Sequence, residues 1–111
     1  MTQHADTLLE RMVESIVDEV DPEQVILFGS RGRGTATDDS DVDLVVVESA
    51  PFGEHRSRRR EAARLWRALG RFEVSKDILL YSRDEVERSR GSLNHVLARA
   101  LREGKVLYER P

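Results

Sequence analysis

The chain begins with a stretch in which apolar residues recur every three or four positions. Between residues 7 and 20 they fall on one face of a helix: Leu8, Leu9, Met12, Val13, Ile16, Val17 and Val20. Thr7 and Glu10 have the spacing of a capping box, and Asp21-Pro22 disfavours a further helical turn. The pattern predicts an amphipathic helix over residues 7–20.

Short apolar runs rich in strand-forming residues follow this helix. Residues 25–28 form the first run and residues 42–47 the second, whose successive apolar positions are typical of a strand covered on both faces. The segment between them, 29–40, is rich in Gly, Thr, Ser and Asp, which predicts a loop with room for one short helix. Residues 72–81 and 105–109 predict two further strands.

Helical spacing returns in three later segments. Residues 54–70 predict a two-faced helix whose core-facing stripe is Ala62, Leu65, Trp66 and Leu69. Ser82 and Glu85 indicate a second capped helix, and residues 92–103 have the apolar face of a third, which Gly104 ends. The order of these elements predicts an α/β (α+β) fold, a small mixed β-sheet flanked by helices, in a single domain over residues 1–111.

Arginines gather on the side of the predicted 54–70 helix that is opposite its apolar stripe. They are Arg56, Arg60, Arg64, Arg67 and Arg71. Two interpretations stay open, a surface for an anionic partner and an ordinary solvated helix face, and the second is the more common use of such a stripe.

The charge, the apolar runs and the cysteine content disfavour several classes of protein. Charged residues make up 35% of the chain and the net charge is −3, which disfavours bulk, sequence-independent binding of nucleic acid because that binding relies on many cations. No apolar run approaches the ~20 residues of a membrane helix, and the first residues lack the pattern of a secretory signal. The chain also has no cysteine, so we expect a cytoplasmic protein without a membrane segment or disulfides.

Two aspartates stand at the start of the second predicted strand. Side chains alternate across a strand, so Asp41 and Asp43 are expected to point to the same side. Like charges held close together there are unfavourable unless cations neutralise them, and hard oxygen ligands suit magnesium or manganese. The alternative is an acidic turn that caps the strand, which is the more frequent meaning of Asp-x-Asp taken alone.

A glycine-rich turn precedes the aspartate pair and favours the metal site over the acidic turn. Gly29 ends a predicted strand, while Gly32 and Gly34 allow the backbone to come close to a bulky anion. Amide groups of such a turn, the hydroxyl of Ser30 and the guanidinium of Arg33 would together bind phosphate groups. We therefore expect a phosphate site facing a metal-binding carboxylate pair rather than a plain surface loop.

Three other phosphate-binding or metal-binding motifs do not fit this segment. A Walker loop requires Lys after its last glycine, but Thr35 follows Gly34. The glycine spacing is the reverse of that in the dinucleotide fingerprint. An EF-hand that begins at Asp39 would need Gly where Leu44 stands and Glu where Ala50 stands.

The segment resembles the signature of the polymerase β-type nucleotidyltransferase superfamily. That signature is Gly-Ser, ten intervening residues and Asp-x-Asp, which Gly29-Ser30 and Asp41-Val42-Asp43 match without a gap. The chain is similar to the minimal nucleotidyltransferases, stand-alone catalytic domains of about this length, and the similarity includes the Glu-Gly-Lys-Val-Leu-Tyr run that ends at Tyr108. The resemblance implies a polymerase β-type nucleotidyltransferase fold.

The resemblance also implies a third carboxylate on a later strand. Asp77 stands at the expected place, directly before an apolar run, and Glu73 is the rival candidate because it would share a strand face with Asp77. Asp41, Asp43 and Asp77 would be the catalytic residues and the ligands of two Mg²⁺ ions, with Mn²⁺ as the other candidate metal.

Gly29, Ser30 and Arg33 would correspond to the contacts with the triphosphate of the substrate, ATP. The implied reaction moves AMP from ATP to a hydroxyl group, with a tyrosine of a partner protein as the expected acceptor. Minimal nucleotidyltransferases of this kind are often antitoxins of toxin–antitoxin pairs, and the partner is a small helical HEPN-domain toxin. The expected function is therefore that of a protein adenylyltransferase.

Two alternatives to this function stay open. One is a subunit of a small-molecule adenylyltransferase of the aminoglycoside type, which would need a second subunit to complete its pocket. The other is a non-catalytic module that neutralises its partner by contact alone. The presence of all three carboxylates disfavours the second alternative, because pure binding does not require them.

Overall fold

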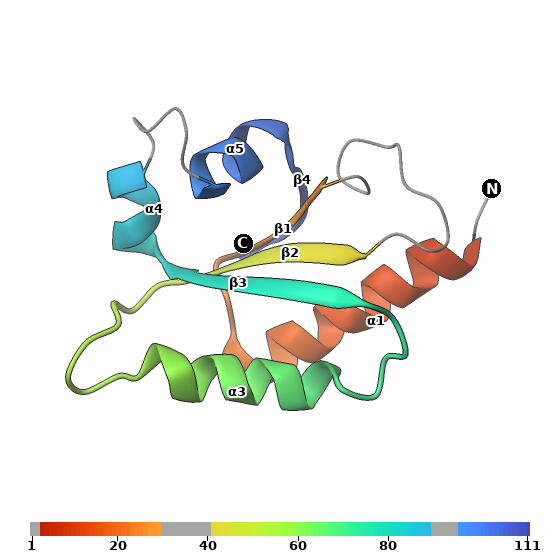
Figure 1. Ribbon diagram of the computed structural model, residues 1–111, viewed down its shortest axis with the longest axis horizontal. Coiled ribbons are helices and arrows are strands. Elements are labelled where there is room, and N and C mark those ends of the chain that lie inside the picture. Colours follow the sequence, from red (N-terminus) through yellow and green to blue (C-terminus); the bar gives the residue numbers. More distant parts are fainter. Residues whose placement is uncertain (1–2, 30–40, 90–95) are drawn as a thin grey trace.

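The computed structural model describes residues 3–29, 41–89 and 96–111, and the strands in these ranges form one mixed sheet. The strands are β1 (Gln24–Phe28), β2 (Val42–Glu48), β3 (Lys76–Ser82) and β4 (Lys105–Glu109). Their spatial order is β3-β2-β1-β4 (Figure 1). β1 is antiparallel to β2 and to β4, and β2 is parallel to β3.

Helices cover both faces of this sheet. They are α1 (Gln3–Val20), α3 (Arg58–Leu69), α4 (Arg83–Ser89) and α5 (Val96–Glu103). α1 and α3 pack against each other on one face, and α4 and α5 lie on the other (Figure 1). α3 lies in the connection between the parallel strands β2 and β3, which must cross from one end of the sheet to the other. The expected α+β fold with a small mixed sheet is confirmed.

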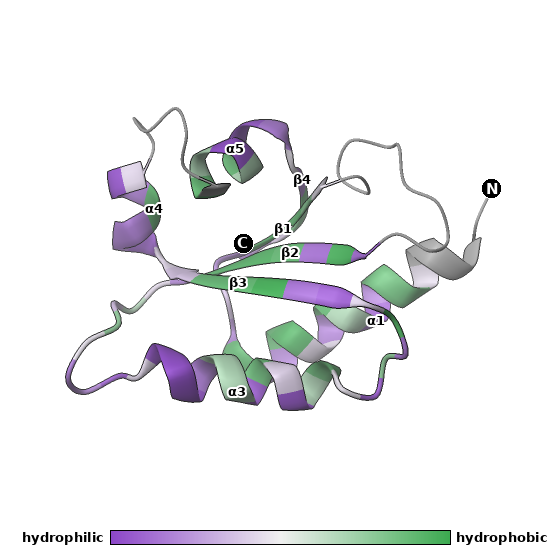
Figure 2. Cartoon of the chain, viewed as in Figure 1, coloured by the Kyte–Doolittle hydropathy of each residue, from purple (hydrophilic) through white to green (hydrophobic). Residues whose placement is uncertain are grey.

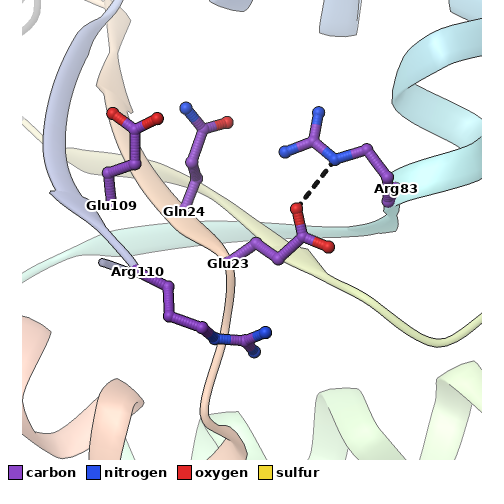
Figure 3. A pocket seen from close by; sticks show the side chains of 5 residues that line it. All are labelled: Glu23, Gln24, Arg83, Glu109 and Arg110. Atoms are coloured by element: carbon purple, nitrogen blue, oxygen red, sulfur yellow. Dashed lines mark hydrogen bonds and ion pairs between the residues drawn. The ribbon is translucent and has the colours of Figure 1, made fainter.

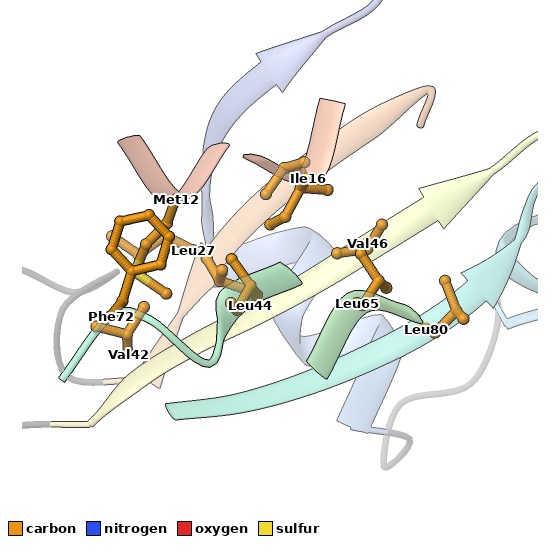
Figure 4. Packing of buried hydrophobic residues seen from close by; sticks show 11 residues of the cluster. Met12, Ile16, Leu27, Val42, Leu44, Val46, Leu65, Phe72 and Leu80 are labelled. Carbon is orange, nitrogen blue, oxygen red and sulfur yellow. The ribbon is translucent and has the colours of Figure 1, made fainter. Parts of the chain in front are cut away.

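Apolar side chains fill a layer on each face of the sheet. The layer beneath α1 and α3 contains buried residues that include Met12, Ile16, Leu27, Val42, Leu44, Val46, Leu65, Leu69, Phe72 and Leu80 (Figure 4). The layer beneath α4 and α5 contains Ile26, Val45, Val47, Val86, Leu97 and Ala100. Successive residues of β2 thus alternate between the two layers, which is why this strand is apolar at nearly every position (Figure 2).

Most expected elements are present, with shifts at their ends. The last strand has the predicted bounds, whereas β3 begins at Lys76 and not at residue 72. α1 begins at Gln3, four residues before the predicted capping box, so Thr7 does not cap it. α3 begins at Arg58, and the side chain of Ser57 caps it by accepting a hydrogen bond from the Arg60 amide at 3.3 Å.

The helix that follows β3 is capped at its start, as predicted. The Ser82 amide donates a hydrogen bond to Glu85 Oε1 at 2.9 Å, as expected from their three-residue spacing. The helix expected over residues 92–103 is observed from Val96, and its first four predicted positions lie outside the described residues. No helix within the described ranges is both long and apolar enough to cross a membrane.

Trp66 does not belong to the core-facing stripe of α3, so its predicted place was wrong. Leu65 and Leu69 are fully buried, but Trp66 is 41% exposed. The buried stripe centres on Leu65 and Leu69, and Trp66 lies about 100° round the helix from Leu65. The stripe predicted from helical spacing was too wide. α1 and β3, which pack against α3, bury Leu65 and Leu69 but leave Trp66 partly exposed.

The arginines near α3 divide into two groups. Arg64 binds Glu19 at 2.9 Å and Glu61 at 3.0 Å, and Arg71 donates a hydrogen bond to Ser15 Oγ at 2.6 Å. These contacts tie α3 and the residues that follow it to α1. Arg60 and Arg67 are exposed as well, but within the described ranges neither side chain forms an ion pair or a hydrogen bond. A single solvated face therefore does not describe the whole arginine stripe.

A buried carboxyl group lies at the end of β2, where Arg56 binds it. Glu48 is only 3% exposed, and Arg56 binds both Glu48 and, at 3.3 Å, Glu61. Burial, followed by the neighbouring Glu61 carboxylate, raises the pKa of Glu48 to about 8. Glu48 Oε2 is buried without a hydrogen-bond partner among the described residues, and a proton shared with Glu61 would satisfy it. Burial of this group therefore favours its protonated form.

Candidate functional site

The structure pairs Asp43 of β2 with Asp77 of β3. The two residues are direct register partners in the parallel ladder. Each stands two positions before a residue of the layer beneath α4 and α5, Val45 in β2 and Leu79 in β3. Because side chains alternate along a strand, both carboxylates lie on the α4/α5 face of the sheet. Hydrophilic segments accordingly occur near the same end of β2 and β3 (Figure 2).

Asp41 lies directly before β2, two residues from Asp43. Its side chain is exposed, and so is that of Asp77, whereas Asp43 is half-buried. The Val42 amide donates a hydrogen bond to the Ser75 carbonyl at 2.8 Å, which joins the chain just before β3 to the start of β2. The structure therefore brings all three predicted carboxylates to one end of the β2–β3 pair.

Gly29 packs against the Asp43 carboxylate. Phe28, the last residue of β1, is the register partner of Asp43, so Gly29 follows immediately beyond that pair. A Cβ atom at Gly29 would lie 3.3 Å from Asp43 Cγ and closer still to Oδ2, and Gly29 has a φ of +70°. Both the backbone conformation and the contact require glycine here. The first residue of the predicted phosphate turn is thus in contact with a predicted metal ligand.

The remaining predicted phosphate contacts lie outside the described residues. Ser30 and Arg33 fall in the segment 30–40, as do Gly32 and Gly34. Their roles stay predictions, and only Gly29 of the turn has a described position, next to Asp43.

Glu73 is a poor rival for the third carboxylate. β3 begins at Lys76, so Glu73 lies outside the strand and does not share a strand face with Asp77 as expected. Its side chain is exposed in the connection between α3 and β3. Asp77, in contrast, is in the ladder opposite Asp43.

The donor chemistry of the three aspartates suits a divalent ion. Carboxylate oxygens are the ligands that Mg²⁺ and Mn²⁺ prefer, and the Asp41 and Asp77 side chains are exposed rather than packed in the core. Within the described ranges, however, no three His, Asp or Glu side chains are already arranged as a ligand group. The backbone therefore places the donors on adjacent strands, and binding of an ion would require side-chain rotation.

A second polar cluster, which sequence reasoning missed, lies at the other end of the sheet. It is an open pocket lined by Glu23, Gln24, Arg83, Glu109 and Arg110 (Figure 3). Gln24 pairs with Val47, whereas Phe28 at the far end of β1 pairs with Asp43.

Arg83 Nε lies 2.9 Å from Glu23 Oε1, so the charges of these two pocket residues neutralise each other. The hydrogen bond with Ser49 is the largest cause that lowers the pKa of Glu23. Arg83 lowers this pKa further, whereas partial burial acts in the opposite direction.

Comparisons with known proteins show the family and the fold of the chain. A family model described as "Nucleotidyltransferase domain" matches residues 9–108. A crystal structure of a proposed nucleotidyltransferase from Sulfolobus solfataricus is similar, with a TM-score of 0.61 and 21% identity over 94% of this chain and 79% of that one. No curated protein matched the sequence.

Two further similar structures are toxin–antitoxin complexes. One is a toxin–antitoxin with AMP-PNP, with a TM-score of 0.55 and 23% identity, covering 91% of this chain and 73% of that one. The other is an MntA–HpeT toxin–antitoxin variant in which two aspartates are replaced by glutamate, with a TM-score of 0.55, 20% identity and the same coverage. At these identities the likeness shows a shared fold.

Proposed function

This chain belongs to the nucleotidyltransferase domain family, and on that premise we propose that it transfers AMP from ATP to a hydroxyl group of a partner protein. We expect the acceptor to be a tyrosine of a small helical HEPN-type toxin, so that the chain acts as the antitoxin. The observation that carries the proposal is the pairing of Asp43 with Asp77 beside Gly29. This pairing supports the proposal because the expected carboxylates and the start of the expected phosphate turn lie at one end of the sheet.

The chain's own residues have separate roles in this reaction. The acceptor oxygen attacks the α-phosphorus of ATP, the bond between that phosphorus and the oxygen leading to the β-phosphorus breaks, and pyrophosphate leaves. Asp77, exposed at the start of β3, would accept the hydroxyl proton on its carboxylate. Amide groups from Gly29 onward, with Ser30 and Arg33, would hold the β- and γ-phosphates.

Divalent ions, once bound, would neutralise the charge on the attacking and leaving oxygens. Asp41, Asp43 and Asp77 would hold them, with Asp43 as the most fixed donor because it is half-buried and packs on Gly29. A carboxylate that is already positioned by the backbone reduces the reorganisation needed on binding.

The toxin–antitoxin setting is supported by two of the similar structures. Both are described as toxin–antitoxin complexes, and one of them contains AMP-PNP, an analogue of ATP. These neighbours favour a protein acceptor over the small-molecule acceptor of the first alternative function. The nucleotide in one of them favours catalysis over the purely non-catalytic module.

ATP is expected to stabilise the protein only in the presence of Mg²⁺ or Mn²⁺. Without a cation the triphosphate and the three aspartates repel each other, so binding should be negligible. A ligand at one hundred times its dissociation constant stabilises a protein by about 2.7 kcal/mol, which a thermal unfolding experiment detects easily. The measurement compares the unfolding temperature with ATP in Mg²⁺ and with ATP in EDTA. An equal rise under both conditions would contradict the proposed site.

A further inference from the structure

The outward side of α3 carries the only tryptophan of the chain, and the same helix carries several exposed arginines. Trp66 is 41% exposed and is one of only two large apolar side chains exposed in the described ranges. At about 100° per residue, Arg59 lies about 20° from Trp66 around the helix axis, and Arg67 and Arg60 lie farther round in the same direction, about 100° and 120° from it. We refer to Arg59, Arg60, Trp66 and Arg67 as the α3 outer patch.

The arginines of this patch differ from most others in their contacts. Within the described ranges, a carboxylate binds each of Arg56, Arg58, Arg64, Arg83, Arg88, Arg99 and Arg110. No such ion pair and no side-chain hydrogen bond is formed there by the exposed Arg59, Arg60 and Arg67. The patch is therefore an uncompensated positive area on a chain whose net charge is −3.

The patch is separate from the candidate active site. α3 covers the sheet face that carries Val42, Leu44 and Val46, whereas Asp43 and Asp77 lie on the α4/α5 face. A molecule bound to the patch would leave the aspartates accessible. The three arginines are thus poorly placed to bind the triphosphate, and another anionic group must be their counterpart.

The residue types favour a protein as that counterpart. Tryptophan and arginine are enriched at the energetic centres of protein interfaces, and guanidinium groups pair with carboxylates in a planar, two-pronged geometry. Arg59 and Arg67 are eight residues apart, or about 12 Å along α3, which is close to two helical turns. Two carboxylates two turns apart on a partner helix would face them, with an apolar residue between.

We propose that the α3 outer patch docks an acidic amphipathic helix of a partner protein. Carboxylates of that helix pair with Arg59 and Arg67, and an apolar side chain covers the indole of Trp66. Nucleic acid is the less favourable occupant, because three arginines neutralise few phosphates and the rest of the chain is acidic overall. The inference does not depend on the proposed transfer chemistry, since the two sites lie on opposite faces of the sheet.

The intrinsic fluorescence of Trp66 tests this proposal directly, because the full chain has no other tryptophan. The probe is a synthetic helical peptide with glutamates two turns apart and leucines between them. We expect a saturable blue shift of the emission as the indole leaves water, and no shift with a peptide that has lysines in place of the glutamates. Absence of a shift with the acidic peptide overturns the proposal. A saturable shift with an oligo-dT strand of equal charge, but not with the peptide, overturns it in favour of nucleic acid.

Charge reversal locates the binding surface. The variant Arg59→Glu with Arg67→Glu should bind the labelled acidic peptide at least about tenfold more weakly, the loss expected for one charge-assisted contact. The control is Arg88→Glu with Arg99→Glu, which changes the net charge equally at exposed residues of α4 and α5 and also breaks their ion pairs with Asp84 and Glu103. Anisotropy of the peptide label gives both affinities, and circular dichroism checks the helix content. Equal weakening in both variants would show a general charge effect and contradict docking at α3.

Discussion

Asp77→Asn is expected to lower the rate of AMP transfer by roughly 10²–10⁴-fold, the usual contribution of a positioned proton acceptor. Asparagine keeps the shape of the side chain but cannot take the proton of the attacking hydroxyl group. ATP should still bind, because Asp43 and the Gly29 turn remain in place. Lost turnover with retained ATP binding is the signature of an interaction needed mainly in the transition state. Single-turnover kinetics and an ATP titration measure the two quantities separately.

Glu73→Gln is the matched control for Asp77→Asn. It removes one negative charge four residues upstream, in the connection that precedes β3, and should leave transfer unchanged. If Glu73→Gln is inactive and Asp77→Asn is active, Glu73 is the third carboxylate and the register argument for Asp77 fails.

Gly29→Ala is expected to damage both the fold and the site. A residue other than glycine in the left-handed region costs roughly 1–2 kcal/mol, which lowers the unfolding temperature. The new methyl group would also displace the Asp43 carboxylate, against which Gly29 packs. A shift of about 1 Å in a catalytic group costs on the order of 10²-fold in rate, so transfer should fall by about that factor.

Gly53→Ala provides the comparison for this substitution. A Cβ atom at Gly53 would meet nothing within 4 Å, and its backbone is not in the left-handed region. Thermal unfolding and the transfer rate should both stay near those of the unchanged protein. If Gly29→Ala behaves like Gly53→Ala, the close packing of Gly29 on Asp43 is not important for function.

The elements of the fold were predictable where local pattern decides the structure. β4 has its predicted bounds because Gly104 ends the preceding helix and an apolar run follows. β3 starts later than expected because its register is set by pairing with β2, from Val42 opposite Lys76 onward. Trp66 was misplaced because periodicity shows which residues share a helix face but not how wide the covered stripe is.

The candidate site was predictable only in part. The Asp-x-Asp pattern at the start of a strand is a local signal, and Asp41 and Asp43 lie where it indicates. The pairing of Asp43 with Asp77 and the packing of Gly29 on Asp43 depend on contacts between separate strands. No periodicity in the sequence contains that information, so only resemblance to a family could suggest Asp77 beforehand.

Transfer of label from ATP tests the central claim most directly. The protein is incubated in Mg²⁺ with a co-purified helical partner, or alone if none co-purifies, and with ATP that is labelled at either the α- or the γ-phosphorus. Nucleotidyl transfer predicts that protein becomes labelled from the α-position only, that pyrophosphate is released, and that EDTA or Asp77→Asn prevents both. Label arriving from the γ-position, or no α-label on either protein, would contradict the account.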